Sequence, residues 1–167
     1  MQKSTTSRKK YHKLADLFYK IGVAYLENQK YDKTEKAFLA SIEVAPQSES
    51  YYSHTGLGNV YYAQKKFDDA INQYERTNRL NEDFPYAING IGNIYFQKGE
   101  YQKAHKYYED ACTQDDKYWH SHFWKPYHNL GLIYLYDDEE KLTHEEKLIN
   151  YKKAEKSLIK LYKFTNI

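Results

Sequence analysis

Residues 57–61 read Leu-Gly-Asn-Val-Tyr, and residues 91–95 read Ile-Gly-Asn-Ile-Tyr. Each segment is followed by two aromatic residues flanking an alanine at the same spacing: Phe67, Ala70 and Tyr74 after the first, Tyr101, Ala104 and Tyr108 after the second. Every member of the second set lies 34 residues after its counterpart. A fixed period of this length indicates an array of repeats, each burying its apolar face against its neighbours.

Apolar residues inside each unit recur at steps of three and four, which predicts two successive amphipathic helices. A glycine in the middle of a helix costs about 1 kcal/mol relative to alanine. Because Gly58 and Gly92 incur that cost at equivalent positions, we expect a neighbouring helix to approach each of them closely.

The pattern continues toward both ends of the chain. An upstream unit is marked by Ile21, Gly22, Tyr25, Tyr31, Phe38, Ser41 and Pro46, and a fourth unit opens with Leu130, Gly131 and Tyr134. The second helix of that fourth unit, marked by Tyr151 and Ala154, comes about a dozen residues later than the period predicts. The fourth unit therefore carries an insertion.

This arrangement resembles the tetratricopeptide repeat (TPR) family, whose period is 34 residues. The resemblance covers roughly residues 11–164 and departs at Thr34, where the family usually has alanine. It implies an all-α superhelix (an α-α solenoid) of about four helix-turn-helix units in a domain spanning residues 8–167, preceded by a flexible tail at residues 1–7. The units are expected at about 15–48, 51–84, 85–118 and 124–164.

Composition excludes several classes of protein. The formal net charge is only +2, from 25 basic and 23 acidic residues, which gives no argument for nucleic-acid binding. There is no apolar run long enough to insert into a membrane. The single cysteine, Cys112, rules out an internal disulfide and fits the cytoplasm or another reducing compartment. Its position predicts a buried, inert thiol.

Nothing in the sequence resembles a catalytic or cofactor site. The paired glycines at 56/58 and 90/92 lie inside predicted helices and follow no strand, so they form no phosphate-binding loop. His120, His122 and His128 are the best metal candidates, but no cysteine or carboxylate accompanies them at ligand spacing. We therefore expect a protein that is not an enzyme and that binds no cofactor or metal.

The resemblance implies that the first helix of each unit lines a concave groove. Counted from the signature glycine, the predicted peptide-binding residues are Tyr19, Tyr52, Thr55, Asn59, Tyr62, Tyr86, Asn89, Asn93, Phe96 and His128. Asparagine amides can pair with any peptide bond, and aromatic residues are enriched at binding hot spots. Gly56 and Gly90 would let a ligand backbone approach closely. These groove residues predict a module that binds a peptide segment of a partner protein, as an adaptor or assembly chaperone.

One specialised type of TPR domain holds the C-terminal carboxylate of chaperone tails with lysine, asparagine and further basic residues. The matching positions here are Tyr19, Val23, Tyr86 and Gly90, and none of them carries the required residue. The resemblance therefore does not extend to that activity.

Several alternatives remain open. The groove residues could serve packing within a longer or oligomeric assembly, and the abundance of asparagine and tyrosine could reflect genome composition. The chain could also be a self-assembling scaffold that uses groove and end-to-end contacts, for which the 119–124 junction and the acidic insertion at 137–140 are the suspected segments. The lysine-rich outer face of the last helix is either a solvated cap of the array or a basic stripe for an anionic partner.

Overall fold

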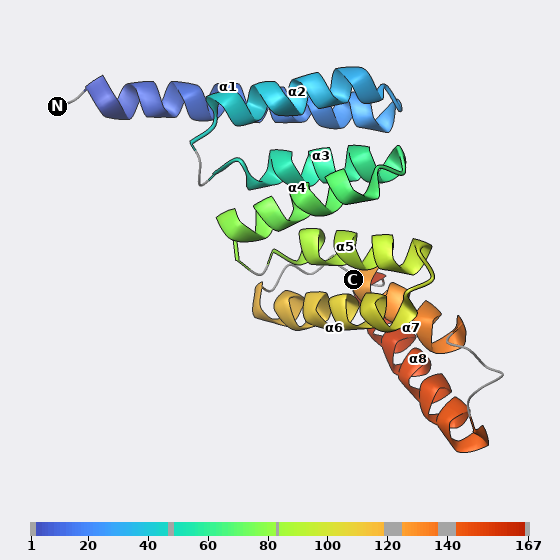
Figure 1. Ribbon diagram of the computed structural model, residues 1–167. Helices are drawn as coiled ribbons and strands as arrows, with labels where there is room; N and C mark the ends of the chain where they lie inside the picture. Colours follow the sequence, from blue (N-terminus) through green and yellow to red (C-terminus); the bar gives the residue numbers. More distant parts are fainter. Residues whose placement is uncertain (1–2, 47–48, 83, 119–124, 137–142, 166–167) are drawn as a thin grey trace. The chain divides into compact units, whose positions relative to one another are not determined.

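The computed structural model describes residues 3–46, 49–82, 84–118, 125–136 and 143–165, and some side chains within 3–8, 115–118, 135–136 and 144–165 lie outside that description. Within these residues the chain forms helices joined by turns, without strands (Figure 1). The helices are α1 (Lys3–Glu27), α2 (Tyr31–Val44), α3 (Tyr51–Ala63), α4 (Phe67–Leu80), α5 (Pro85–Gln97), α6 (Tyr101–Tyr118), α7 (Lys125–Tyr136) and α8 (His144–Thr165).

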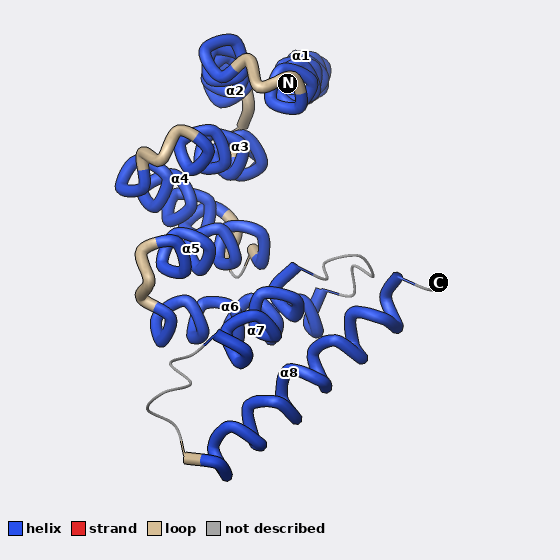
Figure 2. Tube along the Cα trace, turned by 90° about the vertical axis from the view of Figure 1, so that its right-hand side faces the viewer, coloured by secondary structure: helices blue, strands red, loops and turns tan. Residues whose placement is uncertain are grey.

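The same tight turn joins the first three helix pairs. Gln29, Lys65 and Gly99, at equivalent positions, adopt φ angles of 55°, 60° and 74°. In each turn the next residue donates its backbone N–H five residues back, as from Lys30 to the Tyr25 carbonyl at 2.9 Å. This bond satisfies a carbonyl that the end of a helix leaves unpaired. The pairing of α1 with α2 and of α7 with α8 is visible in Figure 2.

The chain divides into two compact units, Met1–Gly90 and Ile91–Ile167, and each is described by itself. The core of the first unit is organised around single aromatic rings from the second helices. A Cβ atom built on either Gly22 or Gly56 would lie 2.6 Å from the Phe38 ring, which is fully buried. The Tyr74 ring meets Gly58 and Gly90 in the same way.

These contacts confirm that a neighbouring helix approaches the repeated glycines closely. They also correct the expectation for Gly56 and Gly90, because the group that approaches them is an aromatic ring of the preceding second helix. Glycine is required there because any Cβ would overlap the ring.

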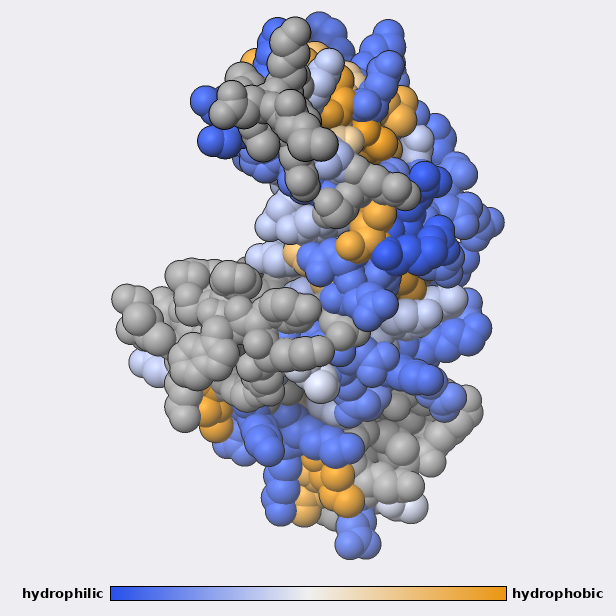
Figure 3. Space-filling model, turned by 90° about the vertical axis from the view of Figure 1, so that its left-hand side faces the viewer, coloured by the Kyte–Doolittle hydropathy of each residue, from blue (hydrophilic) through white to orange (hydrophobic). Residues whose placement is uncertain are grey.

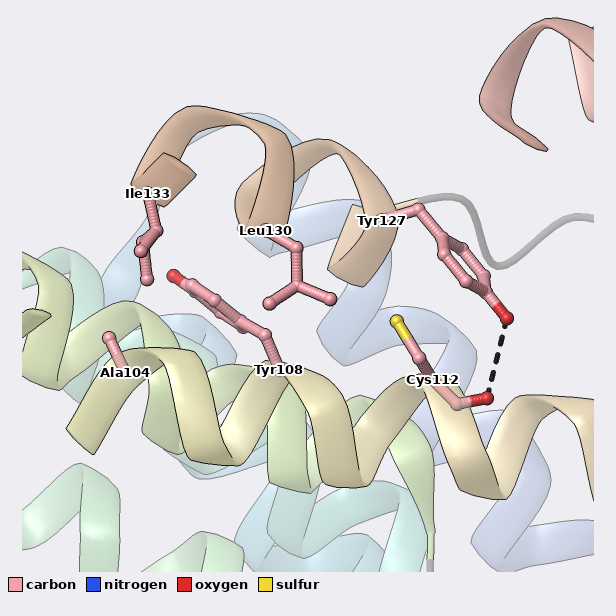
Figure 4. Packing of buried hydrophobic residues seen from close by; sticks show 6 residues of the cluster. All are labelled: Ala104, Tyr108, Cys112, Tyr127, Leu130 and Ile133. Atoms are coloured by element: carbon pink, nitrogen blue, oxygen red, sulfur yellow. Dashed lines mark hydrogen bonds between the residues drawn. The ribbon is translucent and has the colours of Figure 1, made fainter. Parts of the chain in front are cut away.

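In the second unit, α6 and α7 enclose a cluster of buried side chains (Figure 4): Ala104, Tyr108, Cys112, Tyr127, Leu130 and Ile133. The Tyr127 hydroxyl donates to the Cys112 carbonyl at 3.4 Å. The Cys112 thiol is buried, as its position in the sequence predicted.

Two helices are longer than predicted. α1 begins at Lys3, so residues 3–7 are helical where we expected a tail. The periodic pattern also predicts that the second helix of the third unit ends near residue 113, whereas α6 continues to Tyr118. Neither extension contains a proline or glycine that would end a helix. The repeat boundaries given above stay a prediction.

The last helix packs differently from expectation. The spacing of Leu148, Tyr151, Ala154, Leu158 and Leu161 predicts a single inward face of this helix. Ala154 is buried, whereas Leu148 and Leu158 are 48% and 45% exposed, which departs from that prediction. The side chains of Tyr151 and Leu161 lie outside the described part of the structure. Among the described helices, none is long and apolar enough to cross a membrane.

Candidate functional site

A continuous set of aromatic rings lies within the first unit. Its members, called here the aromatic cluster, come from α1, from the start of α3 and from the start of α5: Tyr19, Tyr51, Tyr52, Phe84 and Tyr86. Tyr52 and Tyr86 occupy equivalent positions 34 residues apart, and Tyr19 of α1 reaches the start of α3, which lies beside α1.

Tyr52 is the centre of the cluster. Its ring centroid lies 5.9 Å from that of Tyr19, 4.2 Å from that of Tyr51 and 5.6 Å from that of Phe84. Phe84 in turn lies 5.3 Å from Tyr86. All these separations are within or close to the range of favourable aromatic contacts, so the rings support one another's positions.

The outer rings of the cluster remain accessible. Tyr52 and Tyr86 are 48% and 46% exposed, whereas Tyr19 and Phe84 are half-buried. Contiguous apolar surface of this kind usually marks an interaction site, whereas apolar residues scattered singly over a surface are normal and need no such explanation. Figure 3 shows one face of the molecule, where hydrophobic residues form small patches among hydrophilic ones.

Two tyrosine hydroxyl groups of the cluster, those of Tyr19 and Tyr51, have a raised pKa. Burial raises the pKa of Tyr19, and Tyr52, Tyr86 and Asp16 raise it further. Burial likewise raises the pKa of Tyr51, followed by its hydrogen bond with Tyr52. At neutral pH these groups are therefore hydrogen-bond donors.

Carboxylates at the edge of the cluster already have side-chain partners. Asp16 accepts a hydrogen bond from Lys20 at 2.7 Å, and Glu49 lies 2.5 Å from His12 Nδ1. The surface is accordingly aromatic and polar without a strong excess of either charge.

Asn59 offers one further polar group on α3. Its Oδ1 atom accepts a hydrogen bond from the Tyr74 hydroxyl at 2.8 Å, and its side chain is exposed. The amide nitrogen has no hydrogen-bond partner among the described residues. It can therefore donate to a carbonyl of a bound peptide.

Two of the predicted groove residues are not accessible. Thr55 and Asn89 are only 8% and 5% exposed. Thr55 donates its hydroxyl to the Tyr51 carbonyl at 2.9 Å and lies 3.1 Å from the Thr77 hydroxyl, which places it in the contact between α3 and α4. Both residues are therefore corrected from surface to interior positions.

The remaining predicted residues are half-buried: Tyr62, Asn93, Phe96 and His128. In the second unit, Asn93 Oδ1 accepts from both the Tyr108 hydroxyl and the Asn129 amide, at 2.8 and 2.9 Å. Phe96 packs against the cluster shown in Figure 4. Their use in ligand binding stays a prediction.

Sequence reasoning missed Tyr51 and Phe84. Tyr51 lies beside a predicted groove residue in the sequence, and Phe84 directly precedes the proline that begins α5. An aromatic residue just before the first turn of a helix often packs back onto neighbouring structure, which is the signal that could have found Phe84.

The described residues contain no group of three metal-ligating side chains. His120 and His122 lie outside the described part of the chain.

The family of the chain follows from its sequence. The profile described as "Tetratricopeptide repeat" matches residues 19–77 and again residues 55–118, which together cover more than half of the chain. This protein belongs to the tetratricopeptide repeat family. No curated protein sequence matches it significantly.

Solved structures share the fold at low sequence identity. A crystal structure of MamA matches with a TM-score of 0.67 and 21% identity over 89% of this chain and 81% of MamA. PilF of Pseudomonas aeruginosa matches with a TM-score of 0.72 and 18% identity over 90% of this chain and 63% of PilF. The TPR2B domain of yeast Sti1, in a complex with pHsp70, matches with a TM-score of 0.56 and 16% identity over 85% of this chain and 96% of that domain.

Proposed function

We propose that this chain is a non-catalytic protein-interaction module that binds a peptide segment of a partner protein on the aromatic cluster and Asn59. The observation that carries the proposal is the exposure of Tyr52 and Tyr86 at the surface of a continuous aromatic contact network. Tyrosine provides large contact area with few torsions to immobilise, which favours binding.

Two structural neighbours support a peptide as the ligand. The Sti1 domain is in a complex with pHsp70, and the first TPR domain of RPAP3 is bound to an HSP90 peptide. This chain lacks the carboxylate-holding residues at Tyr19, Val23, Tyr86 and Gly90. We therefore propose an internal, extended segment as the ligand, held by ring contacts and by hydrogen bonds from tyrosine hydroxyls and the Asn59 amide.

The role would be that of an adaptor or assembly chaperone in the cytoplasm or another reducing compartment. The buried state of the single thiol, Cys112, is compatible with this environment.

The test compares the wild-type protein with a Tyr52→Ala/Tyr86→Ala variant as baits for partner capture, followed by titration of peptides from the captured protein. A Tyr11→Ala/Tyr162→Ala variant is the matched control, because it removes two exposed tyrosines outside the aromatic cluster. We expect the first variant to lose at least tenfold in peptide affinity, about 1.4 kcal/mol, and the control to bind like wild type.

Equal binding by all three baits would place the peptide site elsewhere on the molecule. Thermal unfolding of each bait checks that the substitutions leave the fold intact, as expected for partly exposed side chains.

A further inference from the structure

Successive repeats are joined by a specific set of contacts, which the first unit shows between α2 and α3. The Ser53 hydroxyl donates to Ser41 Oγ at 2.8 Å, and the Phe38 ring packs on Gly56. At the far end of the same interface, the Tyr61 hydroxyl donates to Glu35 Oε1 at 2.8 Å.

The second unit repeats the last of these contacts between α6 and α7. Tyr134 occupies the position of Tyr61, and its hydroxyl lies 2.8 Å from His105 Nε2. His105 occupies the position of Glu35. In these two interfaces, a tyrosine of the following first helix is thus hydrogen-bonded to a polar side chain of the preceding second helix.

α1 presents the same interface without a partner. Leu17 and Ile21 are equivalent to Ser53 and Leu57 of α3, which are 2% and 1% exposed, yet Leu17 and Ile21 are 53% and 37% exposed. A helix face that is buried in one repeat is therefore open here.

Tyr25 completes that open face. It is the counterpart of Tyr61 and Tyr134, and a lysine ammonium, that of Lys33, lies 5.7 Å from its ring centroid. Tyr61 has the same kind of neighbour in Lys66, at 5.8 Å. Unlike Tyr61, Tyr25 has no hydrogen-bond partner for its hydroxyl among the described residues.

α8 presents the complementary face. Glu155 is equivalent to Glu35 and His105, is exposed, and has no partner among the described residues. Leu158 occupies the position of Phe38. Phe38 is fully buried, whereas Leu158 is 45% exposed.

We propose that α8 of one copy docks on α1 of a second copy and reproduces the contact between repeats. In this contact Glu155 accepts a hydrogen bond from the Tyr25 hydroxyl, and Leu158 packs beside Leu17 and Ile21. The two free faces belong to the same chain and match at both the apolar and the polar end of the interface, which identifies the occupant as a second copy.

The residue opposite Leu158 is Lys20, where interior repeats have Gly56 or Gly90. Glycine is needed at those positions because an aromatic ring lies so close to the backbone that it would overlap with a Cβ atom. Leucine is shorter than phenylalanine or tyrosine, and the Lys20 ammonium is drawn along α1 to Asp16 at 2.7 Å. The Lys20 stem can then cover Leu158.

The contact is heterologous, because two different faces meet. Each added copy leaves one α1 face and one α8 face free, so assembly grows with concentration unless it closes into a ring. Both helices carry more basic than acidic residues, so added salt is expected to strengthen the association by screening.

The experiment measures mass by sedimentation velocity and light scattering for the wild type, a Leu17→Lys variant and a Glu155→Lys variant. Leu17→Lys blocks the α1 face, and Glu155→Lys blocks the α8 face. Glu145→Lys is the matched control, because Glu145 is also an exposed glutamate of α8 and the charge change is identical.

We expect the mass of the wild type and of Glu145→Lys to rise with concentration. Each blocked variant alone should remain a 20.0-kDa monomer. A mixture of the two blocked variants should form a one-to-one dimer and nothing larger, because one free face of each kind remains. Tyr25→Phe should weaken self-association by roughly five- to tenfold through loss of one hydrogen bond.

A wild-type mass that stays at one chain at every concentration would overturn the proposal. So would a blocked variant that still dimerises alone, which would indicate an isologous contact. These outcomes are independent of peptide binding, because neither substitution touches the aromatic cluster.

Discussion

The Tyr74 hydroxyl donates a hydrogen bond of 2.8 Å to Asn59 Oδ1, across the helix pair α3 and α4. The same bond recurs at 2.8 Å between Tyr108 and Asn93, 34 residues further along the chain. Each tyrosine ring is buried against repeated glycines, and its hydroxyl reaches an asparagine at the edge of the core. The asparagine therefore has a structural role in addition to any contact with a ligand.

Replacing Tyr74 by phenylalanine should lower the free energy of unfolding by about 1 kcal/mol, because the ring stays and one hydrogen bond is lost. Asn59→Ala should cost a similar amount, and the double variant should cost less than the sum of the two. Chemical denaturation of the four proteins measures this coupling. Additive effects would show that the hydrogen bond contributes nothing, and Tyr11→Phe serves as a control on an exposed tyrosine.

Gly56→Ala and Gly131→Ala should change stability in opposite directions. A Cβ on Gly56 would lie 2.6 Å from the Phe38 ring, whereas the nearest atoms to a Cβ on Gly131 are 3.9 and 4.0 Å away. Overlap in the core should destabilise Gly56→Ala by about 1–3 kcal/mol. Gly131→Ala should gain roughly 0.5–1 kcal/mol from helix propensity. Thermal unfolding of both variants measures the contrast, and a stabilised Gly56→Ala would contradict the packing described here.

Ser41→Ala should be more harmful than Ser53→Ala. The Ser41 hydroxyl donates to the Ala15 carbonyl at 2.8 Å and accepts from the Ser53 hydroxyl at 2.8 Å, and both serines are 2% exposed. Loss of Ser41 removes both hydrogen bonds and leaves the buried Ser53 hydroxyl without its acceptor, at about 1–3 kcal/mol, whereas loss of Ser53 leaves the Ser41–Ala15 bond in place. Urea denaturation ranks the two variants, and the reverse order would be inconsistent with this network.

His54 should make the protein less stable in mild acid. Its Nδ1 lies 2.8 Å from Gln73 Oε1, and burial lowers its pKa below 6.5, with a further contribution from Arg76. The unfolded state then binds more protons than the folded state as pH falls through the unfolded pKa, so unfolding becomes easier below that pH. Denaturation at about pH 5 and about pH 8 should show a smaller difference for His54→Gln than for wild type.

An unchanged pH dependence in His54→Gln would show that other groups cause the acid sensitivity.

The fold could be predicted in most of its detail because the repeat period specifies helix pairs and their contacts together. The repeated glycines indicated close approach, and the rings of Phe38 and Tyr74 supply it. The ends of helices were less predictable, since α1 and α6 continue through residues that are neutral toward helix formation.

The candidate site could be predicted only in part. Helical spacing correctly placed Tyr52 and Tyr86 at the surface. It failed for Thr55 and Asn89, because residues at the border of a helix face are covered by side chains of other helices, which spacing alone does not specify. The participation of Phe84 depends on how the chain enters α5, and a periodic pattern contains no information about that entry.

The position of Phe38 between Gly22 and Gly56 bears on how such a chain can change length during evolution. The rings of Phe38 and Tyr74 are each held by glycines from two repeats, so a recombination event in this region preserves the core only if it removes or adds one whole period. Deletion of residues 57–90 would join Gly56 to Ile91-Gly92, which reproduces the present Gly56-Leu57-Gly58 order and leaves Phe38 and Tyr108 opposite their glycines. Deletions of other lengths would place a ring against a side chain, so viable variants of this gene should differ in whole repeats.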